Sequence, residues 1–158
     1  MERRGVAVFP GRLRAALTGP CLLLAGASLA RGEGPPLPRS NAAYVEAGGS
    51  TILGANYERL LSGHASIRVG VGVVPVVGAV PAVCMPNLLV GSDRRQLELG
   101  LGVLVVWEAD GRSYARPTAA AGYRYTAPGG LLFRAGVGVA FFDGRTWVTP
   151  GVSLGRRF

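Results

Sequence analysis

Apolar and polar positions alternate along the segment 147–158. One face of this segment is mostly apolar and consists of Val148, Pro150, Val152, Leu154, Arg156 and Phe158. The other face is small or polar and consists of Thr149, Gly151, Ser153, Gly155 and Arg157. A period of two is typical of a β-strand rather than of a helix. A transmembrane β-strand needs about 9–11 residues, so this segment is long enough to cross a bilayer.

The same alternation predicts eight strands, at approximately 43–50, 52–60, 65–75, 82–90, 95–107, 115–126, 131–142 and 147–158. Residues that favour turns separate them, among them Ser62-Gly63, Gly91-Ser92-Asp93, Asp110-Gly111, Pro128-Gly129-Gly130 and Asp143-Gly144. Lipid offers no partner to an unpaired backbone group, so a sheet that crosses it must close. An even number of strands joined by short connections fits such a barrel. We therefore predict an all-β fold, an eight-stranded antiparallel up-and-down transmembrane β-barrel over 43–158.

The face that we expect to point outward is apolar in successive strands. In the segment 95–107 it consists of Leu97, Leu99, Leu101, Val103, Val105 and Trp107. Aromatic residues collect near the two ends of these faces, as expected for the girdles at membrane interfaces. At the end with the chain terminus we expect Tyr57, Tyr123, Tyr125, Phe133 and Phe158. At the other rim we expect Trp107, Tyr114, Phe141 and Trp147.

The face that we expect to point inward carries charges at one level of the barrel. They are Glu46, Glu58, Arg68, Glu98, Arg124 and Arg134. Counting from the turns places Glu58 opposite Arg68, Arg124 opposite Arg134, and Glu98 opposite Asn87. Two interpretations of this charged layer stay open, a gated polar pathway and a structural plug of ion pairs. The plug is favoured because the interior of an eight-stranded barrel is just filled by side chains.

Proline marks the segment 82–90 as irregular. Pro81 and Pro86 enclose Cys84, and a proline cannot donate to the hydrogen-bond ladder of a sheet. We expect a bulge in this strand. With Asn87 facing inward, Cys84 would face the lipid.

The N-terminal 30 residues have the pattern of a secretory signal peptide. Arginines precede an apolar stretch from Ala15 to Ala30, and Ser28-Leu29-Ala30 offers small residues for cleavage. This predicts a signal peptide over 1–30, a flexible lead-in over 31–42, and export to the bacterial outer membrane. Cleavage would leave Cys84 alone in the mature chain, which excludes an internal disulfide and a cysteine-based metal site. We expect no cofactor and no metal, and we interpret His64 as an exposed turn residue.

The chain is strongly basic, with a net charge of +8 and a pI near 10.7. A basic chain raises the possibility of nucleic acid as a partner. Its arginines are dispersed, however, and no basic stripe interleaved with aromatic residues is present. Anionic lipid of the outer membrane is therefore the expected partner rather than nucleic acid.

Several short segments resemble the small bacterial outer-membrane β-barrel proteins of the OmpA-like type. They are 44–49, 56–59, 67–70, 97–100, 122–125, 132–136 and the last strand. In this family a final strand that ends on an aromatic residue implies recognition by the barrel-assembly machinery. Phe158 is then the assembly signal.

Three classes of function are compatible with these patterns. A structural or uncharacterised envelope barrel with a plugged lumen is favoured. A small pore or a lipid-modifying barrel enzyme is the first alternative, although His64 lies at the wrong end for catalysis with a nucleophile at the outer rim. A soluble ligand-binding barrel of the lipocalin or avidin type is the second, and it would need its apolar face inside. The chain is therefore not expected to be an enzyme, and its oligomeric state stays open.

Overall fold

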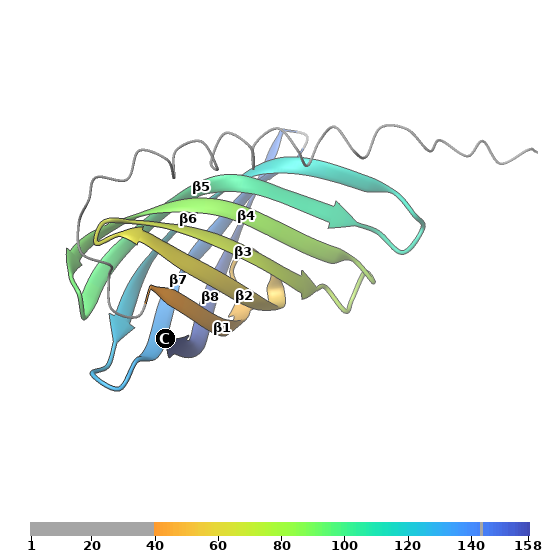
Figure 1. The fold of residues 1–158 in the computed structure, drawn as a ribbon. Coiled ribbons are helices and arrows are strands. Elements are labelled where there is room, and N and C mark those ends of the chain that lie inside the picture. The colour runs from red at the N-terminus through yellow and green to blue at the C-terminus, as the bar shows by residue number, and fades with distance from the viewer. Residues whose placement is uncertain (1–39, 143) are drawn as a thin grey trace, which may run out of the picture. The chain divides into compact units, whose positions relative to one another are not determined.

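The barrel predicted from the alternation is present. The computed structural model describes residues 40–142 and 144–158. Its strands are β1 (Asn41–Gly48), β2 (Ile52–Ser62), β3 (Ala65–Val73), β4 (Val80–Ser92), β5 (Arg95–Trp107), β6 (Ser113–Thr126), β7 (Leu131–Phe142) and β8 (Arg145–Arg157). Each strand pairs antiparallel with the next, and β1 pairs with β8, so the sheet closes (Figure 1). The predicted signal peptide and the lead-in up to residue 39 lie outside the described residues.

The two faces of the sheet have opposite chemistry. Outward side chains are apolar and exposed, and Leu97 and Leu101 keep 59% and 72% of their surface accessible. Inward side chains include charged groups with no accessible surface, such as Glu58 and Arg124. This is the reverse of the arrangement that a soluble ligand-binding barrel requires. No helix in the described part of the chain is long and apolar enough to span a membrane.

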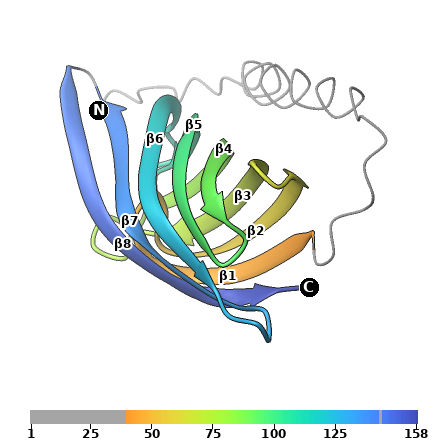
Figure 2. The same ribbon diagram turned by 90° about the vertical axis from the view of Figure 1, so that its left-hand side faces the viewer.

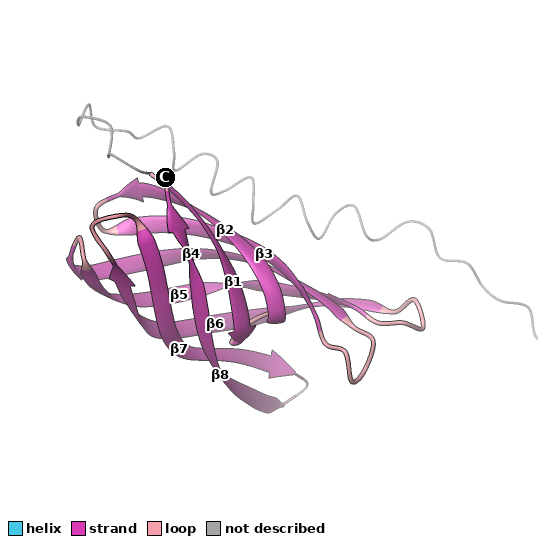
Figure 3. Ribbon diagram, turned by 90° about the horizontal axis from the view of Figure 1, so that it is seen from below, coloured by secondary structure: helices cyan, strands magenta, loops and turns pink. Residues whose placement is uncertain are grey.

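The barrel has two ends, which we name by what they carry. The terminal end carries Asn41, Phe158 and the connections that follow β2, β4 and β6. The hairpin end carries the connections that follow β1, β3, β5 and β7. Every described residue is in a strand or in a short connection, as the colouring of Figure 3 shows. The fold thus has no domain beside the barrel in the described residues.

The connection between β1 and β2 folds into the barrel instead of extending from it. Gly48 and Gly49 have φ angles of 81° and 63°, a left-handed conformation that glycine adopts without strain. Ser50 and Thr51 are consequently buried. A Cβ atom added to inward-facing Gly138 of β7 would lie 2.8 Å from Gly49. Residues 49–51, which we call the tucked turn, therefore occupy the lumen.

The tucked turn leaves the wall incomplete at the hairpin end. The ladder between β1 and β8 stops at the pair Gly48 and Gly151, whereas β8 continues with β7 alone as far as Arg145. Pro150 stands where the ladder stops, and its carbonyl accepts a hydrogen bond from the N–H of Gly49 at 3.1 Å. Because proline has no N–H to donate, it suits a strand edge. Beyond this point β7 and β8 rise as a pair on the side opposite β2 and β3 (Figure 2), and no ladder joins β8 to β1, β2 or β3 there. We call this unpaired stretch of the wall the gap between β8 and β3.

Two details of the pairing correct the predictions for β4. The register with β5 is the same on both sides of Met85 and Pro86, so the ladder is interrupted there without the expected bulge, and Pro81 keeps its register partner Val106. A register shift does occur in the pairing of β2 with β3, between Leu60 and Ser62. Asn87 pairs with Gly100 rather than with Glu98, because β4 and β5 join through a two-residue turn at residues 93–94. Asn87 does face inward, and Cys84 lies on the outward face, as expected.

Candidate functional site

The lumen of the barrel brings together the charged residues that the sequence places on the inward faces. Arg124 forms an ion pair with Glu58, and Arg134 forms one with Glu98. The Nε of Arg124 also lies 3.7 Å from the second carboxylate oxygen of Glu98. Arg124 and Arg134 are directly opposite each other across β6 and β7, as predicted. Glu98 of β5 therefore lies within reach of both arginines and offsets their repulsion.

A second group of contacts ties the tucked turn to the same layer. Glu46 of β1 accepts hydrogen bonds from the backbone N–H of Ser50 at 3.1 Å and from the amide of Asn56 at 2.9 Å. Arg68 lies 3.7 Å from Glu46 and donates to the hydroxyl of Ser50 at 3.1 Å. Glu58 and Arg68 are opposite in register, as predicted, but the ion pairs given above join each of them to another strand. One reason is that Glu46 of β1 and Ser50 of the tucked turn both approach Arg68.

Tyr44 belongs to this layer, although the sequence analysis did not single it out. Its ring is buried, and the guanidinium of Arg134 lies 4.6 Å from the ring centroid. A cation over an aromatic face is attracted by the ring quadrupole. The signal was available in the alternation, because Tyr44 shares its face of β1 with Glu46. Ser50 was missed as well, since the first strand was expected to continue through it.

The charged layer and the tucked turn together fill the lumen at this level. They border a cavity of only about 40 Å³, lined by Glu46, Ser50, Arg68, Glu98 and Arg134 among others. About 10–15 Å³ of such volume is enough to hold one water molecule. The cavity therefore has room for only a few water molecules.

Above the tucked turn the lumen opens into a larger cavity of about 620 Å³ at the hairpin end. Its lining is largely apolar and comes from β4 to β8, from the connection between β3 and β4, from Ile52 of β2 and from the tucked turn. It includes Val74, Ala79, Leu104, Val106, Tyr114, Ala140, Phe142 and Trp147. Phe142 packs edge-to-face against both Tyr114 and Trp147, with centroids 5.9 and 6.4 Å apart. This cavity was not predicted from the sequence, because the apolar inward residues near the hairpin end were not considered together.

Two aromatic residues expected at the outer rim belong to this cavity instead. Trp147 is the partner of Ala140 across β7 and β8, and both face inward. Its position follows from the alternation in β8, where Trp147 shares a face with Thr149 and Gly151. Trp147 is 61% exposed, and its part of β8 is paired with β7 alone. Tyr114 of β6 also faces inward.

The remaining aromatic residues of the predicted girdles lie on the outward face. At the terminal end these are Tyr57, Tyr123, Tyr125, Phe133 and Phe158. Trp107 and Phe141 lie near the hairpin end. The hydroxyl of Tyr57 donates to the side-chain oxygen of Asn41 at 2.7 Å. The outer surface thus carries aromatic residues near both ends and aliphatic residues between them.

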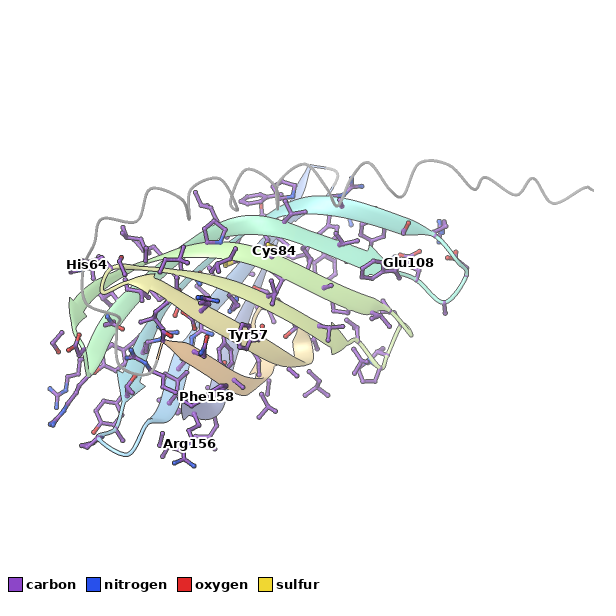
Figure 4. The ribbon with its side chains drawn as sticks, viewed as in Figure 1. Tyr57, His64, Cys84, Glu108, Arg156 and Phe158 are labelled. Atoms are coloured by element: carbon purple, nitrogen blue, oxygen red, sulfur yellow. The ribbon has the colours of Figure 1, made fainter. Side chains whose placement is uncertain are left out.

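The two ends differ in their exposed polar residues. Figure 4 shows His64 at the terminal end and Glu108 at the opposite end of the barrel. The Nδ1 of His64 lies 3.4 Å from the carbonyl oxygen of Leu89. In the connection that follows β5, the backbone N–H and the guanidinium of Arg112 donate to Asp110 and hold the pKa of that carboxyl below its usual value. The described residues contain no group of three His, Cys, Asp or Glu side chains arranged to hold a metal.

Comparison with known proteins identifies the fold. No protein-family model matches the chain, and no curated protein matches it in sequence. The N-terminal β-barrel domain of OprF from Pseudomonas aeruginosa superposes with a TM-score of 0.62 at 12% identity, over 75% of this chain and 95% of that one. The chain has the fold of a small outer-membrane β-barrel.

Two further solved structures support the same conclusion. A de novo designed transmembrane β-barrel gives a TM-score of 0.52 at 17% identity, over 77% of this chain and 99% of the design. The outer membrane protein Ail from Yersinia pestis, in a bilayer nanodisc, gives 0.50 at 11% identity, over 77% of this chain and all of Ail. At these identities the likeness concerns the fold and not the activity.

Proposed function

We propose that this protein spans the bacterial outer membrane as a structural barrel whose lumen is closed, and that it is not an enzyme. The outward residues supply an apolar surface that water would not solvate, and they alternate with inward residues that include buried charges on β1, β2, β3, β5, β6 and β7. A closed barrel satisfies the backbone groups that lipid cannot. This inside-out arrangement supports the placement in a membrane.

The way in which the charged layer and the tucked turn fill the lumen supports the structural role. The charged layer contains Arg68, Arg124 and Arg134 with Glu46, Glu58 and Glu98, so its formal charges cancel. The tucked turn covers this layer and is held by Glu46 and Arg68. A pore would need a continuous aqueous path, which a cavity of about 40 Å³ does not provide. A lipid-modifying enzyme would need a nucleophile and a base at the outer rim, whereas His64 lies at the terminal end.

The proposal includes a route to the membrane. Export would use the signal peptide over 1–30, and insertion would use the barrel-assembly machinery acting on the strand that carries Phe158. In the barrel, Phe158 and Asn41 exchange two backbone hydrogen bonds, of 2.8 and 3.0 Å, that close β8 on β1. Lipid of the outer membrane is the partner that the apolar outer surface fits.

Fractionation of the cell envelope tests this function. The native chain is expected in the outer-membrane fraction, with a mature N-terminus at Arg31. Its band in a detergent gel is expected to shift on heating, because a folded barrel resists the detergent until it is heated. Recovery of the full-length chain in a soluble fraction, or a band that does not shift, would contradict the proposal.

A further inference from the structure

We propose that the cavity at the hairpin end binds the acyl chain of an anionic membrane lipid, which enters sideways through the gap between β8 and β3. This inference rests on the proposed placement of the barrel in a membrane. The cavity has a volume of about 620 Å³, which lies within the range of roughly 300–1,000 Å³ that is typical of ligand pockets. It is separated from the terminal end by the tucked turn, so its occupant has to come from the hairpin end or from the side.

The lining of the cavity suits a hydrocarbon chain. Pro81 of β4, with Leu104 and Val106 of β5, forms one wall. Phe142 and Trp147 form part of the opposite wall. The hydroxyl of Thr118, also in the lining, already donates to the carbonyl of Val139 at 2.8 Å. The walls therefore offer extensive apolar contact and few free polar groups, which favours an apolar ligand over a sugar or a peptide.

The position of the gap explains how such a chain could enter. On β8 the outward residue at the gap is Val148, and it is 62% exposed. On the other side Leu53 of β2 is 49% exposed, and Val73 of β3 is 47% exposed. These apolar side chains face outward at the level of the gap, where water would be unfavourable and lipid tails are expected. The gap thus opens toward hydrocarbon.

Charge complementarity selects the headgroup. Arg145 lines the cavity on the same face of β8 as Trp147, two residues closer to the hairpin end. It pairs in register with Phe142, at the last pair of β7 and β8 before their connection. A lipid whose chain lies along Trp147 would place its headgroup near this guanidinium. Arginine binds phosphate well because its planar donors match the phosphate oxygens. A lipid with a net negative charge is attracted more strongly than a zwitterionic lipid that carries the same phosphate.

The two tryptophans of the chain allow a direct test, because Trp147 lines the cavity and Trp107 faces outward. Two single-tryptophan proteins, W107F and W147F, would be folded into phosphatidylcholine vesicles. Phosphatidylglycerol with a dibrominated stearoyl chain is the probe, since bromine quenches tryptophan fluorescence on contact. In W107F we expect quenching of Trp147 that saturates at a low mole fraction of probe. In W147F we expect quenching of Trp107 that only rises in proportion to the probe. Equal, proportional quenching of both would overturn the proposal.

Filling the cavity provides a matched pair of variants in the W107F background. Ala140→Phe places a ring in the cavity and is expected to abolish the saturable quenching of Trp147. Ala119→Phe, on the outward face of the neighbouring β6, adds the same ring and is expected to leave it unchanged. Ala79→Phe, from the opposite wall, serves as a second filling variant. Saturable quenching that survives both filling variants would contradict binding in the cavity.

The headgroup and the membrane placement are tested separately. Arg145→Gln is expected to reduce the preference for brominated phosphatidylglycerol over brominated phosphatidylcholine by about fivefold, the contribution of one arginine near an anionic surface. A preference that stays unchanged would overturn the assigned role of Arg145.

A heat-dependent gel shift after reconstitution reports insertion. If the native chain fails to insert, both the proposed function and the lipid site are overturned. If it inserts and Trp147 shows only proportional quenching, the lipid site alone is overturned.

Discussion

Glu98 is the residue on which the charged layer depends, because Arg124 and Arg134 face each other and both reach this carboxylate. Glu98→Ala would leave arginine charge uncompensated inside the barrel. Removing one partner of a buried ion pair typically costs about 3–5 kcal/mol, a large share of the stability of a small domain. We expect the free energy of unfolding to fall by that amount. Urea titration of the barrel folded into vesicles, followed by tryptophan fluorescence, measures it.

Glu108 provides the matched control for this substitution. It is also a glutamate paired with an arginine, since its carboxylate lies 3.1 Å from Arg112, but the guanidinium of Arg112 is 76% exposed. Exposed pairs contribute about 0–1 kcal/mol, so Glu108→Ala should change the urea midpoint little. A similar loss for both variants, or no loss for Glu98→Ala, would show that the buried layer does not stabilise the barrel.

At the scale of the element, the tucked turn depends on glycine at position 49. The φ angle of Gly49 is 63°, and a Cβ atom there would contact the Oε1 of Glu46. A left-handed conformation costs a residue with a side chain about 1–2 kcal/mol. Gly49→Ala is therefore expected to lower the free energy of unfolding by at least that amount, measured by urea titration as above.

Gly63, in the connection between β2 and β3, is the control for the turn. An added Cβ atom would meet no heavy atom within 4 Å there. Gly63→Ala should leave the urea midpoint nearly unchanged. If both alanine variants are equally stable, the turn does not require its left-handed glycine.

The strands show how far a sequence can predict such a barrel. Alternation determines strand faces because the pleat sends successive side chains to opposite sides. The six charged residues of the layer were therefore placed inward without a structure. Trp147 was misplaced because it was assigned by its residue type, aromatic near a rim, against the parity of its own strand. The tucked turn was missed for another reason. Gly48-Gly49-Ser50 is equally compatible with an exposed hairpin, and its inward position depends in part on contacts with distant β3, β7 and β8.

For the whole molecule, closure of the barrel depends on the pairing of β8 with β1. Deleting Phe158 removes both of its backbone hydrogen bonds to Asn41, and we expect less of the heat-modifiable form in the outer membrane. Phe158→Ala keeps those backbone groups and removes only the ring. If the aromatic ring is the assembly signal, both variants accumulate in the periplasm. If closure alone matters, only the deletion does, and normal assembly of both would contradict either role.

The proposal that the lumen is closed predicts the electrical behaviour of the whole barrel. In planar lipid bilayers the native protein is expected to show no steady ion conductance, because the charged layer and the tucked turn leave a cavity of only about 40 Å³. Glu46→Ala removes the acceptor of the Ser50 N–H and of the Asn56 amide, and also the carboxylate beside Arg68. The turn then loses its main polar anchor, so we expect brief openings in this variant. Glu108→Ala, outside the lumen, should stay silent. A steady, reproducible conductance of the native protein would refute the plug and favour a pore.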